Sequence, residues 1–271
     1  MRAYLQHVRL LSLSLVLGVF AVPLHAAQSP ADPPAAQLEP KALDILKAMS
    51  ARLTSTQGLS FKAVTTYEKP SRLGPPLTYS SVALVTEQRP DQLRVMTSGD
   101  GPATEFYYDG KQAYAFERKD NLLAQVDAPP TIDATLEAAY QRAAIYFPFT
   151  DVIVADPYKD LSTDMRVAFY IGQSTVVGDT TTDVIAYASD SVFVQAWIGT
   201  EDKLPRRLRA VFLDDPSRSR HQIDFSDWKL SSAMPAAFFK PENIESAHRI
   251  TFAPPPALSA PQGVKEPVTK P

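Results

Sequence analysis

Histidine, the side chain most often used for metal binding and acid–base catalysis, is scarce in this sequence. Only His221 and His248 follow residue 25, and they lie far apart, so neither His-x-x-x-His nor His-x-x-Glu-His occurs. A zinc or non-haem iron site would need carboxylates for most of its ligands, which suits those metals poorly. We therefore expect no metal site, and we expect His221, beside Arg220 in a predicted strand, to be a surface or half-buried imidazole.

A series of acidic residues, Asp151, Asp156, Asp160 and Asp164, has the spacing of a candidate calcium loop or carboxylate pair. The alternation of ligands around a central glycine that such a loop requires is missing. Asp156, which precedes Pro157, and Asp160 are therefore expected to begin turns and to cap short helices.

Motifs for nucleophilic catalysis and nucleotide binding are also missing. The nearest approach to a nucleophile elbow, Gly172 to Val176 around Ser174, lacks the second glycine, and no helix is predicted after it. The sequence contains neither Gly-x-x-x-x-Gly-Lys nor Gly-x-Gly-x-x-Gly. It has no cysteine, which excludes disulfides, thioether-bound haem, thiolate zinc sites and thiol catalysis. We expect neither enzymatic activity nor a cofactor.

Aromatic side chains, most of them on predicted strands, are the feature with the clearest chemical use. They are expected either to fill an ordinary core or to line a cavity for an apolar ligand, since ligand pockets are lined mainly by apolar and aromatic groups. Period-two alternation alone does not distinguish the two faces of a strand. The residues predicted to bind ligand are Phe106, Phe116, Tyr140, Trp197, Phe212 and Phe225.

A basic group, Arg206, Arg207 and Arg209, alternates with Leu208 and Ala210. This alternation predicts a strand with one solvated face and one apolar face. The arginines are expected to be solvated, with contact to an anionic headgroup as the alternative. The whole chain carries 27 basic and 30 acidic residues, a net charge of −3, which argues against a nucleic-acid or anionic-membrane binder.

The first residues have the layout of an export signal. Arg2 and Arg9 precede an apolar run from residue 10 to about residue 24, which is too short to span a bilayer as a helix. We predict a signal peptide over residues 1–26, with cleavage after Ala26 or Ala27, and an uncleaved membrane anchor is the alternative. Proline-rich sequences predict a disordered leader over 27–40 and a disordered tail over 254–271, on either side of one domain at 41–253.

Within that domain the hydrophobic period changes twice. Apolar residues at steps of three and four predict amphipathic helices over 41–54 and 131–146, and a further helical turn is expected at 151–155. Asp109-Gly110 predicts a hairpin turn between two strands. Strands are predicted at 61–67, 77–87, 93–97, 105–108, 112–117, 122–126, 175–177, 182–188, 192–198, 205–213 and 220–230.

These elements predict an α+β fold: a large curved antiparallel sheet of about ten or eleven strands, forming an unclosed β-barrel with helices over its concave face. Five segments are similar to a family of predicted periplasmic proteins of unknown function within the lipoprotein-carrier (LolA/LolB-like) superfamily. They are Gln195-x-Trp197-Ile198, Leu204-Pro205-Arg206-Arg207-Leu208, Tyr108-Asp109-Gly110-Lys111, Thr131-Ile132-Asp133 and Pro148-Phe149-x-Asp151. The resemblance covers most of residues 42–250.

The resemblance implies a half-barrel around a helical lid, with an apolar cavity that in the carriers accepts the acyl chains of lipoproteins. Without cysteine, the chain resembles the soluble carrier rather than the lipid-anchored acceptor. The expected function is a periplasmic, non-enzymatic binding protein for a lipid, a lipoprotein acyl chain or another amphiphile. The alternative is an envelope interaction or sensor protein with a protein partner. Neither a nucleic-acid partner nor integration into the membrane after signal cleavage is expected.

Overall fold

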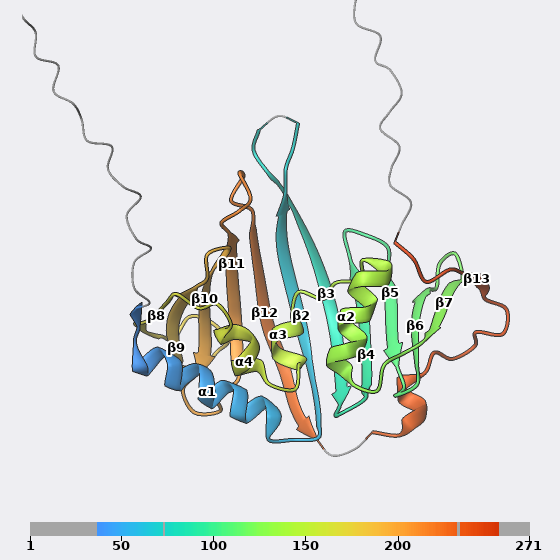
Figure 1. The fold of residues 1–271 in the computed structure, drawn as a ribbon, viewed down its shortest axis with the longest axis horizontal. Coiled ribbons are helices and arrows are strands. Elements are labelled where there is room, and N and C mark those ends of the chain that lie inside the picture. The colour runs from blue at the N-terminus through green and yellow to red at the C-terminus, as the bar shows by residue number, and fades with distance from the viewer. Residues whose placement is uncertain (1–36, 73, 232–233, 255–271) are drawn as a thin grey trace, which may run out of the picture. The chain divides into compact units, whose positions relative to one another are not determined.

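One 13-stranded sheet organises the residues that the structure, a computed structural model, describes: 37–72, 74–231 and 234–254 (Figure 1). The predicted signal peptide and most of the predicted leader and tail lie outside the described residues. The strands are β1 (Gln37–Leu38), β2 (Gly58–Lys69), β3 (Leu77–Gln88), β4 (Gln92–Gly99), β5 (Thr104–Tyr108), β6 (Gln112–Glu117), β7 (Leu122–Asp127), β8 (Val167–Ser174), β9 (Thr182–Ala188), β10 (Val192–Gly199), β11 (Pro205–Phe212), β12 (Arg220–Ser231) and β13 (His248–Ile250).

Two antiparallel meanders lie side by side in this sheet, in the order β1-β8-β9-β10-β11-β12-β2-β3-β4-β5-β6-β7-β13. The join is the long pairing of β12 with β2, which brings the last long strand beside the first. The short strands β1 and β13 pair in parallel with their neighbours and form the two ends of the sheet. The sheet is therefore not closed by hydrogen bonds, and the predicted α+β fold with an unclosed barrel is confirmed.

The described sheet has more strands than the ten or eleven predicted. The predicted strand at 175–177 is wrong, because those residues form a turn and the strand, β8, precedes them. The edge strands β1 and β13 are two and three residues long, and all their residues are exposed. Such short exposed segments carry no apolar alternation, so the pattern used for the other strands cannot detect them.

The helices lie on one face of the sheet, in front of it in Figure 1. They are α1 (Pro40–Thr54), α2 (Ile132–Ala143), α3 (Thr150–Ile153) and α4 (Pro157–Ser162). A 3-10 helix, η1 (Ala236–Phe239), follows β12 in the chain. Leu46, Met49 and Leu53 of α1 are fully buried and join the apolar core of the sheet. Pro40 suits the first turn of α1, because backbone N–H groups there have no acceptor within the helix and a proline, which has no N–H, loses no hydrogen bond.

Helix α2 begins at a capped residue and ends earlier than predicted. The Thr131 side chain accepts a hydrogen bond from the Ala134 N–H (3.2 Å), which satisfies one of the free donors of the first turn. At the other end Ala144 adopts a left-handed conformation (φ 53°) and stops the helix. The predicted extension to residue 146 is therefore wrong.

Residues 144–149, called the strap below, run from the end of α2 to α3 across the concave face of the sheet. Phe147 and Phe149 of the strap are buried, with ring centroids 5.7 Å apart. Phe149 packs edge-on against Phe61 of β2 (5.7 Å), and Phe147 against Phe106 of β5 (5.3 Å). The strap is thus attached to the middle of the sheet through aromatic contacts.

The segment after β12 covers the opposite face of β4–β7. There Tyr107, Tyr114, Phe116 and Leu123 form a second apolar cluster, on which Ile244 and Ala247 of this segment pack. This coverage explains why strands at one end of the sheet are buried on both faces.

The strap contacts predict a large stability loss for Phe149→Ala. Phe149 is 1% exposed, and truncating a buried Phe to Ala typically costs about 3–5 kcal/mol through lost burial and the cavity that remains. The free energy of unfolding, measured by urea titration, should fall by that amount, whereas Tyr146→Ala, at an exposed neighbour, should change it by about 0.5 kcal/mol or less. Equal small losses for both variants would contradict the anchoring role of Phe149.

Candidate functional site

Three adjoining pockets lie between the helices and the concave face of the sheet. Ile145 and Phe147 of the strap line all three, so the strap is the wall that they share. Their cavity volumes are about 490, 320 and 620 Å³. These volumes are in the range of ligand sites, which are typically about 300–1,000 Å³. Below they are called the hydroxyl, apolar and acidic pockets, in that order.

The apolar pocket lies between the strap and strands β4–β7. Apart from a few threonines and the two glutamates Glu105 and Glu117, its lining is apolar, and residues 250–253 close its outer side. Glu105 accepts hydrogen bonds from Tyr107 and Arg118, and Glu117 accepts two from backbone N–H groups of the following turn. The apolar residues that line this pocket are Val95, Phe106, Ala115, Phe116, Leu122, Ala124, Ala143, Ile145, Phe147, Ile250, Phe252 and Ala253.

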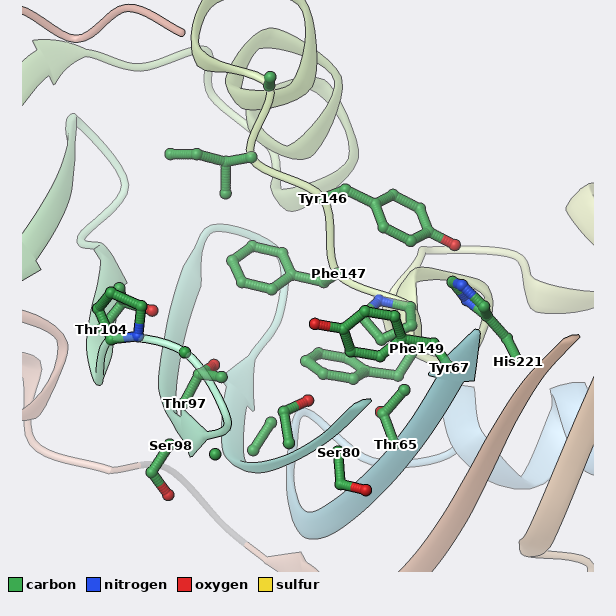
Figure 2. Close-up of a pocket in the computed structure, with 18 of the residues that line it drawn as sticks. Thr65, Tyr67, Ser80, Thr97, Ser98, Thr104, Tyr146, Phe147, Phe149 and His221 are labelled. Carbon is green, nitrogen blue, oxygen red and sulfur yellow. The ribbon is translucent and has the colours of Figure 1, made fainter. Parts of the chain in front are cut away.

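The hydroxyl pocket lies on the other side of the strap, over β2, β3 and β4 (Figure 2). Its lining combines the strap aromatics with hydroxyl groups from the sheet and two nitrogen-bearing side chains, Lys69 and His221. The His221 ring packs edge-on against Phe212 (5.0 Å) and lies 5.7 Å from the Tyr67 ring. Burial, and then the positive charge of Lys69, lower the pKa of His221 below its usual value.

The acidic pocket lies between α2, the strap and α3–α4, and Phe212 at the end of β11 also lines it. Asp133, Glu137, Asp151 and Asp160 contribute four carboxylates. Although Asp151 is open to solvent, the surrounding protein removes part of its hydration, and this, together with the nearby Asp160, raises the pKa of Asp151 to about 6. Desolvation and the nearby Asp151 charge also raise the pKa of Tyr146 to about 12.

The six residues predicted to bind ligand are divided among several places. Phe106 and Phe116 line the apolar pocket, and Tyr140 and Phe212 line the acidic pocket. The Phe116 ring packs mainly in the second cluster, on the far face of the sheet.

The other two predicted residues lie away from these three pockets. Trp197 is on the outer face, because its neighbours Ala196 and Ile198 point into the core, and its ring lies beside Arg207 (5.8 Å). Phe225 is buried in the core against Phe61, at 5.7 Å.

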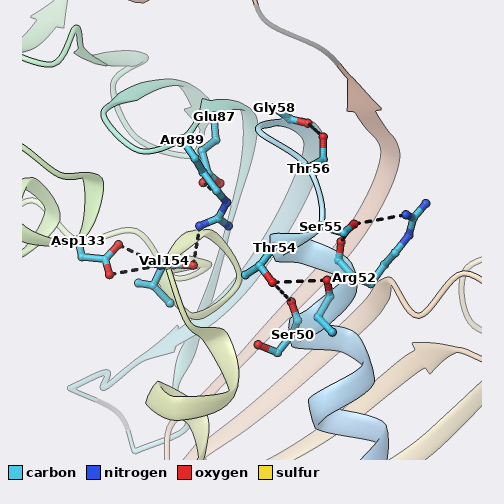
Figure 3. A network of polar contacts seen from close by, with 12 residues as sticks. Ser50, Arg52, Thr54, Ser55, Thr56, Gly58, Glu87, Arg89, Asp133 and Val154 are labelled. Atoms are coloured by element: carbon cyan, nitrogen blue, oxygen red, sulfur yellow. Dashed lines mark hydrogen bonds and ion pairs between the residues drawn. The ribbon is translucent and has the colours of Figure 1, made fainter.

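Two buried side chains in close contact, Glu87 and Arg89, join the sheet to the helical cover (Figure 3). The Arg89 Nε lies 3.0 Å from the Glu87 Oε1, and Glu87 has no exposed surface. Arg89 also donates from Nη1 to the carbonyl of Val154, which ends α3, at 2.9 Å. Next to it, the Asp133 carboxylate of α2 accepts the Ala155 N–H, at 3.1 and 3.2 Å to its two oxygens. These contacts hold α2 and α3 together over the end of β3.

Glu87 and Arg89 make few hydrogen bonds for two buried polar side chains. Within the described residues neither Glu87 oxygen has a hydrogen-bond partner, and the same is true of the Arg89 Nε and Nη2, although the charges are close. Burial therefore outweighs the attraction of Arg89 and raises the pKa of Glu87 to about 8.

Sequence reasoning missed Glu87 and Arg89, although one signal for Glu87 existed. Glu87 has the same parity along β3 as the buried Ala83 and Val85, so period-two alternation assigns this carboxylate to the core face. A charged group at a core position requires a partner, and Arg89 is the nearest basic residue in the sequence.

In the described part of the chain, no group of three or more His, Asp or Glu side chains has an arrangement that could hold a metal ion. No helix in the described ranges is long and apolar enough to cross a membrane.

Comparison with known proteins identifies a family. Residues 42–253 match the family described as "Predicted periplasmic protein (DUF2092)". This match confirms the resemblance to a family of predicted periplasmic proteins that the sequence motifs indicate. The comparison with curated proteins found no match.

Several solved structures are similar to this chain. An uncharacterized conserved protein from Thermus thermophilus has 14% identity and a TM-score of 0.46, over 78% of this chain and 99% of the other. A LolA superfamily protein from Nitrosomonas europaea has 13% identity and a TM-score of 0.33, over 74% and 97%. MucB in the Pseudomonas aeruginosa MucA/MucB complex has 14% identity and a TM-score of 0.40, over 78% of this chain, which spans 64% of that one.

The raised pKa of Glu87 predicts a specific pH dependence of stability. The folded state holds the Glu87 proton more tightly than the unfolded chain does, so this contribution is complete below about pH 4.5 and is lost as the pH rises towards about 8. Glu87→Gln removes the titration. The difference in free energy of unfolding between wild type and Glu87→Gln should therefore shift in favour of the variant across that window.

The control for this measurement is Glu245→Gln, at an exposed residue after η1. Its difference from wild type should stay constant over the same pH range. A constant difference for Glu87→Gln as well would contradict a buried, protonated Glu87.

Proposed function

The chain belongs to the DUF2092 family of predicted periplasmic proteins, and from this premise we propose that it is a non-enzymatic binding protein for an amphiphile. The apolar pocket would hold the alkyl or acyl tail. One observation carries the proposal: a cavity of about 320 Å³ with a mostly apolar lining lies between the strap and strands β4–β7. A lipid or the acyl chain of a lipoprotein is the class of ligand that such a lining suits.

The energetics favour a tail over a polar ligand. Each methylene moved from water into an apolar site contributes about 0.8 kcal/mol. The glutamates at the pocket margin already accept hydrogen bonds from the protein, so the lining offers a ligand few polar partners. An alkyl chain needs none, whereas a sugar or nucleotide would lose its hydrogen bonds to water.

The strap is attached to the sheet at fewer points than helix α2 is. Helix α2 buries Ile132, Leu136 and Ala139 in the core. The strap is held mainly by its two aromatic anchors, Phe147 and Phe149. We expect entry of a ligand to require displacement of the strap rather than of the sheet, because the sheet is connected by continuous ladders of hydrogen bonds.

Binding of an envelope protein is the second candidate function. Two large aromatic side chains, Tyr140 and Tyr146, are 58% and 57% exposed at the mouth of the acidic pocket and contact each other edge-on. Exposed tyrosines are enriched in protein interfaces, so this mouth is where we would expect a partner to bind. Loss of partner capture by Tyr140→Ala, with ligand binding retained, is the outcome that would favour this function.

Ala115→Phe tests the proposed tail site. Ala115 lies half-buried on the wall of the apolar pocket, and a phenyl group there would occupy much of its volume. Binding of the apolar fluorophore N-phenyl-1-naphthylamine to protein purified without detergent should weaken by at least about tenfold, or about 1.4 kcal/mol. Because the phenyl group enters an open cavity, the melting temperature should stay near that of wild type.

The matched control is Ala51→Phe, on the exposed side of α1, which should bind the fluorophore as wild type does. Unchanged fluorophore binding by Ala115→Phe would contradict the tail site. A loss of stability of about 1–3 kcal/mol would show instead that the site is already packed with side chains.

A further inference from the structure

The concave face changes from apolar to hydroxyl-bearing along the strands. Paired residues across β2–β5 form one apolar row, Phe61, Val85, Val95 and Phe106. The next row is Ala63, Ala83, Thr97 and Thr104, and the one after it contains Thr65, Ser81 and Gly99. The apolar pocket lies at the first rows and the hydroxyl pocket at the later rows.

The two pockets adjoin, because Thr97, Thr104, Ile145 and Phe147 line both. A single extended ligand could therefore place an apolar part in one and a polar part in the other. The hydroxyl pocket must then match the polar part in charge and in hydrogen bonding.

The hydroxyl pocket is lined by basic side chains and by no acidic ones. The basic ones are Lys69 and His221. The Lys69 Nζ lies 6.0 Å from the centroid of the Tyr67 ring and makes no ion pair with any described residue. The nearby Asp100 is not part of the lining, and its carboxylate accepts the Ser80 N–H (2.6 Å) at the rim. A negatively charged group is the complement of this arrangement.

Thr65 provides an independent indication of a ligand. It is 3% exposed and follows Phe61 and Ala63 on the concave face, with its side chain lining the pocket (Figure 2). Its hydroxyl makes no hydrogen bond with any described residue, and the small exposed part of the residue borders the pocket, so the hydroxyl is free to donate to a group bound there. An acceptor oxygen from a ligand would satisfy it.

We propose that the hydroxyl pocket binds the anionic head group of the amphiphile: a carboxylate, phosphate or sulfonate beside Lys69, His221 and Thr65. This inference rests on the proposed function, since it takes the tail to lie in the apolar pocket. Lys69 supplies the charge, and Thr65 donates a hydrogen bond to a head-group oxygen. The other titratable side chains that face His221 from the pocket lining are Tyr67, Lys69 and Tyr146, none of which carries negative charge at neutral pH.

Three ligands with the same tail test the proposal: decanesulfonate, decanol and decyltrimethylammonium, titrated calorimetrically into protein purified from the periplasm. Decanesulfonate should bind tightest. Lys69→Gln should weaken decanesulfonate binding by about fivefold, the size expected for an exposed charge contact, and leave decanol binding unchanged. Lys62→Gln, on the same strand but on its opposite face, is the matched control and should change neither.

Two further readouts separate recognition from structure. Thr65→Val should leave the free protein as stable as wild type or slightly more so, yet weaken decanesulfonate binding by about threefold to tenfold. In nuclear magnetic resonance titrations decanesulfonate, but not decanol, should raise the pKa of His221, and the His248 signals should not respond to either ligand.

The outcomes distinguish this inference from the function on which it rests. If decanol binds and decanesulfonate binds no tighter, or if Lys69→Gln and Thr65→Val leave their ratio unchanged, the head-group site is wrong and the tail site stands. If none of the three ligands binds, both are wrong. Replacing decanesulfonate by decanoate and by decyl phosphate then identifies a fatty acid or a phospholipid as the better source of the anion.

Discussion

The packing of two strap aromatics, Phe147 and Phe149, against the middle of the concave sheet is the contact on which the other features depend. A sheet this wide buries an apolar face, and the four α-helices of the described chain cover only part of it. The strap crosses the remaining area and is held by rings rather than by a hydrogen-bonded ladder. It therefore fills the centre of the half-barrel and leaves cavities on its sides, which share Ile145 and Phe147 as a common wall.

The three cavities differ in chemistry because they meet different parts of the same sheet and cover. Towards β4–β7 the strap faces alanines and phenylalanines, towards the ends of β2 and β3 it faces hydroxyls with Lys69 and His221, and towards α2–α4 it faces carboxylates. Positive and negative groups thus lie on opposite sides of one short segment. Under the proposed function, an amphiphile would have one orientation in which its tail and its head both have complementary surroundings.

Much of the architecture could be predicted from the sequence, and the site only partly. Helix α1 and most strands have strong local patterns, and their predicted ends lie within one or two residues of the described ones. Strand β2 begins three residues before its predicted start, and β8 has no predicted counterpart. The end of α2 was missed because Ala144, rather than a glycine, adopts the left-handed conformation. Trp197 was assigned to the cavity although its face is set by the pairing of β10, which alternation alone leaves open. Predicting the Glu87–Arg89 pair requires knowing which face of β3 Glu87 lies on. Predicting the path of the strap requires tertiary contacts that no local sequence pattern encodes.

Mass spectrometry of an organic extract tests the central claim, that the cavity beneath the strap holds an amphiphile, most directly. The protein would be expressed in the periplasm and purified without detergent before extraction. The account predicts a co-purifying acyl or alkyl species in stoichiometric amount, carrying an anionic head group. A folded protein that yields no such species, and that takes none up when incubated with a total lipid extract of the envelope, would contradict it and leave partner binding as the function to pursue.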